Sequence, residues 1–266
     1  MKILIVGGGN MGRTYAESFI ANHSVARRDL FLLEKAEEKR PYFLGLGFES
    51  VYSEPGPFIG EMNLIVLAVK PQDTHALFNR IRPFMKADQL VLSIMAGVRI
   101  ETLIRELPTR KIVRAMPNLP AQVGMGMTGF TADISVSRAE LFSVQNLLNT
   151  TGKSLYFVQE DLLDGVTAIS GSGPAYVYYF MQAMIDAAVG MGFSAAEAET
   201  MVLQTFLGAV HLLNNNNFTC QEWIEKVSSK GGTTEAAVNS FESDILSELI
   251  GKGLKAALKR SVELGA

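Results

Sequence analysis

The chain of 266 residues has few of the residues that build disulfides, metal sites or nucleic-acid-binding faces. Its single cysteine, Cys220, excludes an internal disulfide or a thiolate metal cluster and predicts a reducing, cytoplasmic setting. The histidines, His23, His75 and His211, match no metal-ligand spacing, so we expect no metal. A net charge of −3 offers no basic face to a nucleic acid. No grouping of Ser or Cys with His and Asp indicates nucleophilic catalysis.

One uncharged segment raises the question of a membrane span. No residue between Asp164 and Asp186 is charged, and the segment is long enough to cross a bilayer. Its Ser-Gly-Ser-Gly-Pro run at 170–174 favours a broken loop followed by a helix buried among other helices. The N-terminus lacks a long apolar stretch before a small-residue cleavage site, so we expect neither a secretory signal nor a membrane partner.

The first part of the chain alternates short apolar runs with helical stretches. The predicted strands are Ile3–Val6, Leu30–Leu33, Leu64–Val69, Leu90–Ile94 and Ile112–Ala115, and the predicted helices are Asn10–Asn22, Glu34–Arg40 (ended by Pro41) and Asp73–Ile81. Apolar strands separated by helices are typical of βαβ units, whose right-handed crossovers give a doubly wound parallel sheet of the Rossmann type. We therefore predict an α/β, dinucleotide-binding domain over residues 1–160.

The second part, from about Glu160 onward, lacks strand-like runs. The predicted helices are Tyr176–Met191, Ala195–Leu213, Thr219–Val227, Thr234–Ile250 and Leu254–Leu264. The sequence thus predicts an all-helical domain over residues 161–266. Its first helix is apolar nearly all round, and a domain of this size buries such a helix poorly alone, so we expect a subunit interface.

A glycine-rich turn joins the first predicted strand to the first helix. It fits G-x-G-x-x-G and consists of Gly7, Gly8, Gly9, Asn10, Met11 and Gly12. In a dinucleotide-binding turn Gly7 allows the tight bend, Gly9 lets the backbone approach a pyrophosphate, and Gly12 lets the helix lie close to the strand. The helix start then offers unpaired N–H groups to the anion. A turn that is merely tight is the alternative.

An acidic residue at the end of the second strand bears on the choice of coenzyme. Glu34 follows Gly12 by 22 residues, where an acid normally accepts hydrogen bonds from the adenosine ribose. A carboxylate there repels a 2′-phosphate and favours NAD. Lys35, Lys39 and Arg40, however, are close enough in sequence to neutralise a phosphate. A solvated carboxylate at a helix start is the alternative for Glu34.

Ligands of doubly wound sheets bind beyond the C-terminal ends of the strands. The candidate coenzyme contacts at these ends are Ala68, Val69, Lys70, Pro71, Ala96 and Asn118. Small side chains at Ala68 and Ala96 leave room for a flat nicotinamide ring. Lys70 supplies a positive charge and Asn118 an amide, although Lys70 also fits an ordinary surface lysine.

The stretch from Val227 to Val238 predicts a second anion site. Two glycines and two threonines stand directly before a helical run, where Thr233 or Thr234 can cap the helix and Glu235 suits its first turn. Backbone N–H groups around 232–234 can bind a carboxylate, and a threonine hydroxyl can orient a substrate atom. An ordinary helix cap is the alternative.

Together these motifs resemble the pyrroline-5-carboxylate reductase family. The resemblance rests on segments in the family's order along nearly the whole chain: Gly7–Gly12, Ala68–Pro71, Arg114–Asn118, Ile169–Tyr176 (ISGSGPAY) and Val227–Thr234 (VSSKGGTT). It implies a Rossmann domain, a helical dimerisation domain and an active site between them that is shared with the partner subunit, in homodimers that commonly assemble into decamers. The implied reaction reduces 1-pyrroline-5-carboxylate to L-proline with NADPH or NADH, the last step of proline biosynthesis.

The resemblance also assigns roles to residues. It places the pyrophosphate at Gly7–Gly12 and the nicotinamide at Ala68–Pro71 and Ala96. The implied substrate-binding residues are Ser229, Gly232, Thr233, Thr234 and Glu160, with Thr234 beside the imine nitrogen as the catalytic candidate. Glu34 departs from the small residue that many members carry, which leaves the choice between NADH and NADPH open.

Two other functions share part of this pattern. A hydroxyacid dehydrogenase of the 6-phosphogluconate type shares the glycine turn but places a catalytic lysine on the first long helix of its second domain, and residues 175–185 contain no Lys, His or Arg. A non-catalytic NAD(P)-binding protein is the second alternative. The intact VSSKGGTT loop argues against it, and oxidation of the coenzyme by the imine separates the two.

Overall fold

The computed structural model describes residues 1–265, which fall into two compact units. The first unit comprises residues 1–172 together with the C-terminal residues from 257 onward, and the second comprises residues 173–256. The domain boundary expected after residue 160 stays a prediction.

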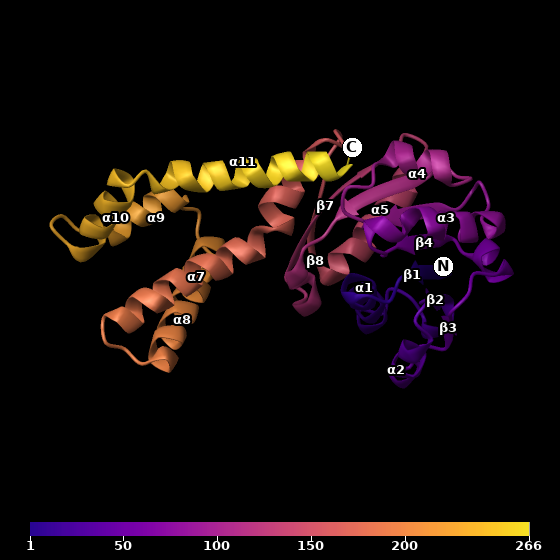
Figure 1. Cartoon of the computed structure of the whole chain (residues 1–266), viewed down its shortest axis with the longest axis horizontal. Coiled ribbons are helices and arrows are strands. Elements are labelled where there is room, and N and C mark those ends of the chain that lie inside the picture. Colours follow the sequence, from indigo (N-terminus) through magenta and orange to yellow (C-terminus); the bar gives the residue numbers. More distant parts are fainter. Residues whose placement is uncertain (266) are drawn as a thin grey trace. The chain divides into compact units, whose positions relative to one another are not determined.

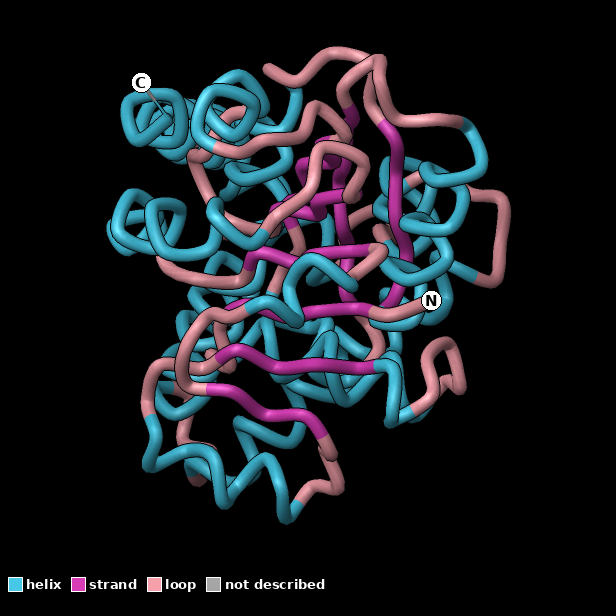
Figure 2. The backbone as a smooth tube through the Cα atoms, turned by 90° about the vertical axis from the view of Figure 1, so that its right-hand side faces the viewer, coloured by secondary structure: helices cyan, strands magenta, loops and turns pink. Residues whose placement is uncertain are grey.

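A single eight-stranded sheet forms the centre of the first unit, in the order β3-β2-β1-β4-β5-β6-β7-β8. The strands are β1 (Ile3–Val6), β2 (Leu30–Leu33), β3 (Ser50–Tyr52), β4 (Leu64–Leu67), β5 (Leu90–Ser93), β6 (Ile112–Met116), β7 (Gly126–Ala132) and β8 (Gly152–Tyr156). β1 to β6 pair in parallel, β7 is antiparallel to β6, and β8 is parallel to β7. Figure 2 shows the strand direction turning across the sheet, the usual twist. The predicted doubly wound, Rossmann-type fold is confirmed.

Helices cover both faces of this sheet. They are α1 (Asn10–Ala21), α2 (Arg40–Gly45), α3 (Thr74–Ile81), α4 (Ile100–Glu106), α5 (Arg138–Leu148) and α6 (Leu162–Val166), followed by a π-helical turn, η8 (Thr167–Gly171). Along β1, Ile3 and Ile5 join the core formed with α1 and α5, whereas Leu4 and Val6 join the core formed with α3 and α4. A strand buried on both faces needs apolar residues at every position, which explains the continuous apolar runs.

The segment after β2 differs from the predicted helix 34–40. A 3-10 turn, η2 (Glu37–Lys39), leads directly into α2, and Pro41 lies in the first turn of that helix. Proline is tolerated there because the first helical N–H groups have no intrahelical partner. The expectation that Pro41 ends a helix is therefore wrong. Three strands, β3, β7 and β8, were not predicted: β3 is very short, and glycine and threonine weaken the apolar pattern of β7.

The second unit contains only helices among its described residues. They are α7 (Gly173–Gly190), α8 (Ala195–Asn214), α9 (Cys220–Val227), α10 (Thr233–Ser243) and α11 (Leu246–Gly265), of which the last turns belong to the first unit. α7 and α8 pack side by side (Figure 1). α7 still exposes large apolar side chains, among them Tyr178 and Tyr179. Over residues 1–265, no helix is long and apolar enough to cross a membrane.

The break between the last two helices lies elsewhere than predicted. Instead of helices 234–250 and 254–264, α10 ends at Ser243 and α11 runs from Leu246 onward. Ile245 adopts a φ of 51° between them. A β-branched residue is rare in this left-handed region, where glycine is the usual signal, so the sequence does not mark this break.

Phe130 on β7 tests the contribution of the sheet core. Its side chain is fully buried and meets Tyr156 of β8 edge-on, at 5.5 Å between ring centroids. We expect Phe130→Ala to lower the free energy of unfolding of the first unit by about 3–5 kcal/mol. Urea unfolding followed by circular dichroism measures the change. Phe142→Ala, at an exposed position on α5, is the matched control and should stay within about 0.5 kcal/mol of the parent protein.

Candidate active site

The glycine turn brings α1 unusually close to β1. Gly7 has a φ of 100° and donates its N–H to the carbonyl of Leu33 at 2.8 Å. A Cβ at Gly12 would collide with the carbonyl oxygen of Gly7, so only glycine allows this approach. A Cβ at Gly9, by contrast, would meet no protein atom. The first turn of α1 therefore faces open space that a pyrophosphate can enter.

A cavity of about 450 Å³ opens beside this turn, beyond the C-terminal ends of β1, β2 and β4. Six of the predicted coenzyme contacts line it: Gly7, Gly9, Glu34, Ala68, Val69 and Lys70. Ser53, Asp73 and Arg80 also line the cavity, although they were not among the predicted coenzyme contacts. Another cavity, of about 480 Å³, is lined by Met1, Asn63 and other residues near the opposite ends of the strands, and contains none of the predicted residues. The cavity beside the glycine turn thus fits the adenosine end of a dinucleotide in its position and in the residues that line it.

The Glu34 carboxylate is fixed by the backbone around it. It is 8% exposed, and its oxygens accept hydrogen bonds from the N–H of Gly8 at 2.8 Å and of Ala36 at 3.0 Å. Lys39 lies 3.7 Å from the same carboxylate. Glu34 is therefore not the solvated helix-start residue of the alternative interpretation. Because an ionised carboxylate has about four acceptor sites, it can still accept hydrogen bonds from ribose hydroxyls.

Three of the four cations that line the cavity, Lys35, Lys39 and Arg80, are paired with acids of the chain, and the fourth is Lys70. Lys35 Nζ lies 3.4 Å from Asp73, and Arg80 forms an ion pair with Glu54. Lys39 faces Glu34, as described above. These pairs reduce the positive charge that Lys35, Lys39 and Arg80 offer to a 2′-phosphate, whereas Lys70 follows β4 in the same cavity lining.

Asn118 is engaged with protein groups. Its amide nitrogen lies 3.2 Å from both the carbonyl and the hydroxyl oxygen of Ser170, and its amide oxygen accepts from the N–H of Met127 at 2.8 Å. The side chain thereby ties the ISGSG turn to the segment that follows β6. Ala96 lies in the loop after β5, and Pro71 opens the 3-10 turn η4 (Pro71–Asp73). Their contacts with a coenzyme stay predictions.

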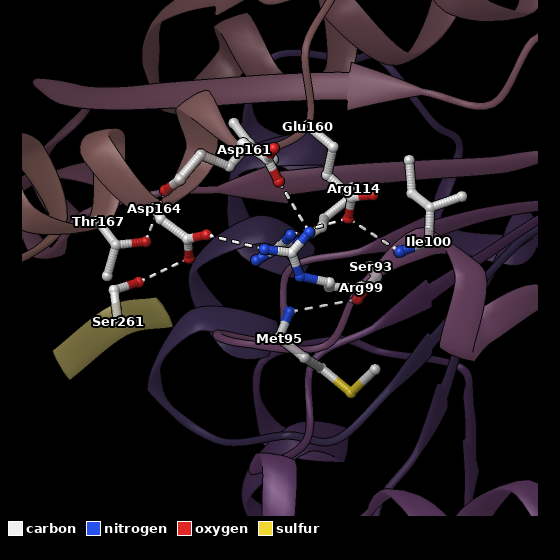
Figure 3. A network of polar contacts seen from close by, with 11 residues as sticks. Ser93, Met95, Arg99, Ile100, Arg114, Glu160, Asp161, Asp164, Thr167 and Ser261 are labelled. Atoms are coloured by element: carbon white, nitrogen blue, oxygen red, sulfur yellow. Dashed lines mark hydrogen bonds and ion pairs between the residues drawn. The ribbon is translucent and has the colours of Figure 1, made fainter. Parts of the chain in front are cut away.

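Glu160 belongs to a polar network within the first unit (Figure 3). Its Oε1 atom accepts from Arg114 at 2.8 Å and from the N–H of Ile100 at 2.9 Å. Arg99 donates to Asp161 at 2.8 Å, and this hydrogen bond raises the pKa of Arg99 while burial opposes the shift. The structure thus shows Glu160 bonded to protein partners, and the substrate contact implied by the resemblance stays a prediction.

The Val227–Val238 stretch forms a turn and a helix start in the second unit. α10 begins at Thr233 with Gly232 as the N-cap, so the expectation that Thr233 or Thr234 caps this helix is wrong. Glu235 lies in the first turn, as predicted, and its carboxylate accepts from the N–H of Gly231 at 2.7 Å. The N–H of Gly232 donates to Ser229 at 2.9 Å.

This arrangement leaves a helix start that can bind an anion. The N–H groups of the first turn of α10 have no intrahelical acceptor, because four N–H groups at the start of any helix lack one. Thr233 is exposed and Thr234 half-buried, so both hydroxyls belong to the surface of this helix start. The turn can therefore offer N–H and hydroxyl groups to a small carboxylate.

Most of the network around Glu160 has no signal in the sequence. The partners of Asp164, namely Arg99 and Ser261, lie 65 and 97 residues away from it in sequence. Pairs at such separations have no local pattern. The one available signal is an arginine inside an otherwise apolar strand, Arg114, which needs a buried partner.

The fold and the glycine turn place this chain in the class of dinucleotide-dependent oxidoreductases with a Rossmann domain. Residues 2–97 match a family model described as NADP oxidoreductase, coenzyme F420-dependent, and residues 160–264 match one described as pyrroline-5-carboxylate reductase dimerisation. The pyrroline-5-carboxylate reductase of Pseudomonas aeruginosa is 35% identical over 99% of this chain and 96% of its own length. The chain belongs to the pyrroline-5-carboxylate reductase family.

Solved structures agree with this assignment. A pyrroline-5-carboxylate reductase from Coxiella burnetii has a TM-score of 0.92 at 30% identity and covers 100% of this chain and 98% of its own. The Plasmodium falciparum pyrroline carboxylate reductase, solved with NADP bound, has a TM-score of 0.88 at 28% identity, with coverage of 100% and 98%. The likeness therefore extends over both units and not over the nucleotide-binding part alone.

Gly12 tests the close approach of α1 to β1. We expect Gly12→Ala to raise the dissociation constant for NADH about tenfold or more, since relieving an overlap of this kind typically costs about 1–3 kcal/mol. Titration of NADH fluorescence measures the constant. Gly45→Ala is the matched control, because a Cβ there would meet no protein atom. Equal affinities of the Gly12→Ala and Gly45→Ala proteins would show that this approach does not form the pyrophosphate site.

Proposed function

We propose that this chain reduces the C=N bond of 1-pyrroline-5-carboxylate to give L-proline, with NADH or NADPH as the reductant. The proposal is carried by two features that this chain has together: the cavity beside the glycine turn and the helix start at Gly232–Thr234. The cavity fits a dinucleotide, and the helix start fits a small carboxylate. A dehydrogenase of the 6-phosphogluconate type would need a catalytic lysine at 175–185, and this chain has none there. A non-catalytic NAD(P)-binding protein would not need a second anion site.

Each group has a chemical task in this reaction. When bound, the coenzyme supplies the hydride, which goes to the imine carbon while the nitrogen gains a proton. The N–H groups at the start of α10 hold the substrate carboxylate, and the hydroxyl of Thr234 lies by the nitrogen. Threonine is a weak acid, so Thr234 orients the nitrogen or relays a proton through water, and positioning contributes most of the rate.

Thr234 is the most direct test of this proposal. We expect Thr234→Val to lower turnover about tenfold or more, the scale for loss of a positioned proton-handling group, and to leave NADH affinity unchanged. Oxidation of NADH by pyrroline-5-carboxylate, with L-proline as the product, measures turnover. Thr234→Ser keeps the hydroxyl and is the matched control. Full turnover in Thr234→Val would remove this hydroxyl from the mechanism.

We further propose that NADH is the better coenzyme. Glu34 is held in place by two backbone N–H groups, so it cannot easily swing away from a 2′-phosphate, and the neighbouring Lys35 and Lys39 are paired with Asp73 and with Glu34 itself. A free ribose hydroxyl can donate to this carboxylate, whereas a phosphate beside it meets repulsion between like charges.

Exchange of Glu34 tests this preference. We expect Glu34→Ser to shift the ratio of kcat/KM for NADPH over NADH by about tenfold or more toward NADPH, because juxtaposed like charges cost more than about 1.4 kcal/mol. Steady-state kinetics with both coenzymes measure the ratio. Glu38→Ser, at an exposed position nearby, is the control. A parent enzyme that already prefers NADPH strongly would contradict the proposal.

We also propose that the helical unit pairs two copies of the chain. The match of residues 160–264 to a dimerisation model and the exposed apolar side chains of α7 support this homodimer. Assembly of dimers into a decamer and a cytoplasmic location remain predictions.

A further inference from the structure

The loop between β5 and α4, residues 94–99, carries Ala96, and its end is anchored by the ion pair of the buried Arg114 with the half-buried Glu160. Arg114 of β6 is 3% exposed and donates to Glu160 at 2.8 Å. The same carboxylate oxygen accepts from the N–H of Ile100, the first residue of α4, at 2.9 Å. Because Glu160 is held by Arg114, the point where the loop enters α4 has a fixed position.

Arg99, the residue before Ile100, is held by two further carboxylates. Arg99 donates to Asp161 at 2.8 Å and lies 3.4 Å from Asp164. The Asp164 side chain is only 4% exposed, and its other oxygen accepts from the hydroxyl of Ser261 at 2.8 Å. Figure 3 shows Ser261 reaching this carboxylate from the C-terminal helix, with Arg99 on the other side. A buried carboxylate requires such partners, since removing one leaves charge without compensation.

The backbone of the same helix also touches the loop. Gly97 has a φ of 76°, and a Cβ there would lie 3.0 Å from the carbonyl oxygen of Leu264. A Cβ at Gly265 would likewise lie 3.1 Å from the carbonyl oxygen of Gly97. The last turn of α11 and the loop that carries Ala96 are therefore in backbone contact, within the first unit.

We propose that Ser261, through Asp164 and Arg99, is a positioning residue for the coenzyme-binding loop at 94–99. Its hydroxyl completes the partners of Asp164, Asp164 and Asp161 hold Arg99, and Arg99 fixes the loop in the form that receives the nicotinamide end of the coenzyme. The inference rests on the proposed function in one respect, the contact of Ala96 with the coenzyme. Sequence alone gives no reason to connect a serine in the final helix with coenzyme affinity.

The loss of this hydrogen bond has a measurable consequence. Without the Ser261 hydroxyl, the loop populates its binding form less, and the apparent dissociation constant rises in inverse proportion to that population. We expect Ser261→Ala to raise the dissociation constant and the KM for NADH about fivefold, which corresponds to a binding-competent fraction of about one fifth. At saturating NADH, kcat and the KM for pyrroline-5-carboxylate should match those of the parent enzyme.

The controls separate positioning from folding. Alanine is the better helix former, so Ser261→Ala does not weaken α11 itself. Ser261→Thr keeps the hydroxyl and should restore NADH affinity, and Ser247→Ala makes the same change at an exposed position of the same helix. Fluorescence titration of NADH with each full-length protein gives the dissociation constants, and thermal unfolding reports the stability of each variant.

Two results would overturn the inference. One is an unchanged NADH dissociation constant in Ser261→Ala, with or without a fall in kcat or unfolding temperature, which is the behaviour of a merely structural serine. The other is a Ser261→Thr protein that binds NADH as weakly as Ser261→Ala, which would show that the hydroxyl does not position the loop. Because the titration needs no imine, it decides this inference even if the parent protein fails to reduce pyrroline-5-carboxylate, a failure that would overturn the proposed function alone.

Discussion

The contact between α1 and β1 at Gly12 is the constraint on which the rest of the first unit depends. Because no Cβ separates the helix from the Gly7 carbonyl, the start of α1 lies at the very end of the strand. Gly9, the N-cap of this helix, then lines the same cavity as Glu34. One missing side chain thus places an anion site and a ribose acceptor at the same sheet edge.

Sequence periodicity and composition could predict most of this framework. The parallel strands are continuous apolar runs because both faces of the sheet are buried, and the glycine turn and Glu34 follow from the spacing of a βαβ unit. Pro41 and Ile245 show where local rules fail. Proline both ends and begins helices, and a left-handed isoleucine leaves no mark in the sequence, so neither position could be interpreted from its neighbours alone.

The residues of the candidate site also fall into those that the sequence could identify and those that it could not. Gly7, Glu34 and Lys70 line one cavity, as their positions at strand ends predict. The partners of Asn118 and Glu160 could not be predicted, since Ser170 lies 52 residues from Asn118 and Arg114 lies 46 residues from Glu160 in sequence. Motifs therefore identify residues that line a cavity better than residues that hold other residues in place, because the latter depend on tertiary contacts.

Reduction of 1-pyrroline-5-carboxylate by this chain requires that a dinucleotide and a small cyclic imino acid bind for one reaction. The most direct test is to mix the purified protein with NADH and 1-pyrroline-5-carboxylate and to quantify L-proline against oxidised coenzyme. We expect repeated turnovers with one proline formed for each NADH consumed. Tight binding of NADH without formation of proline, with NADPH tested in parallel, would contradict the claim and identify a nucleotide-binding protein without reductase activity.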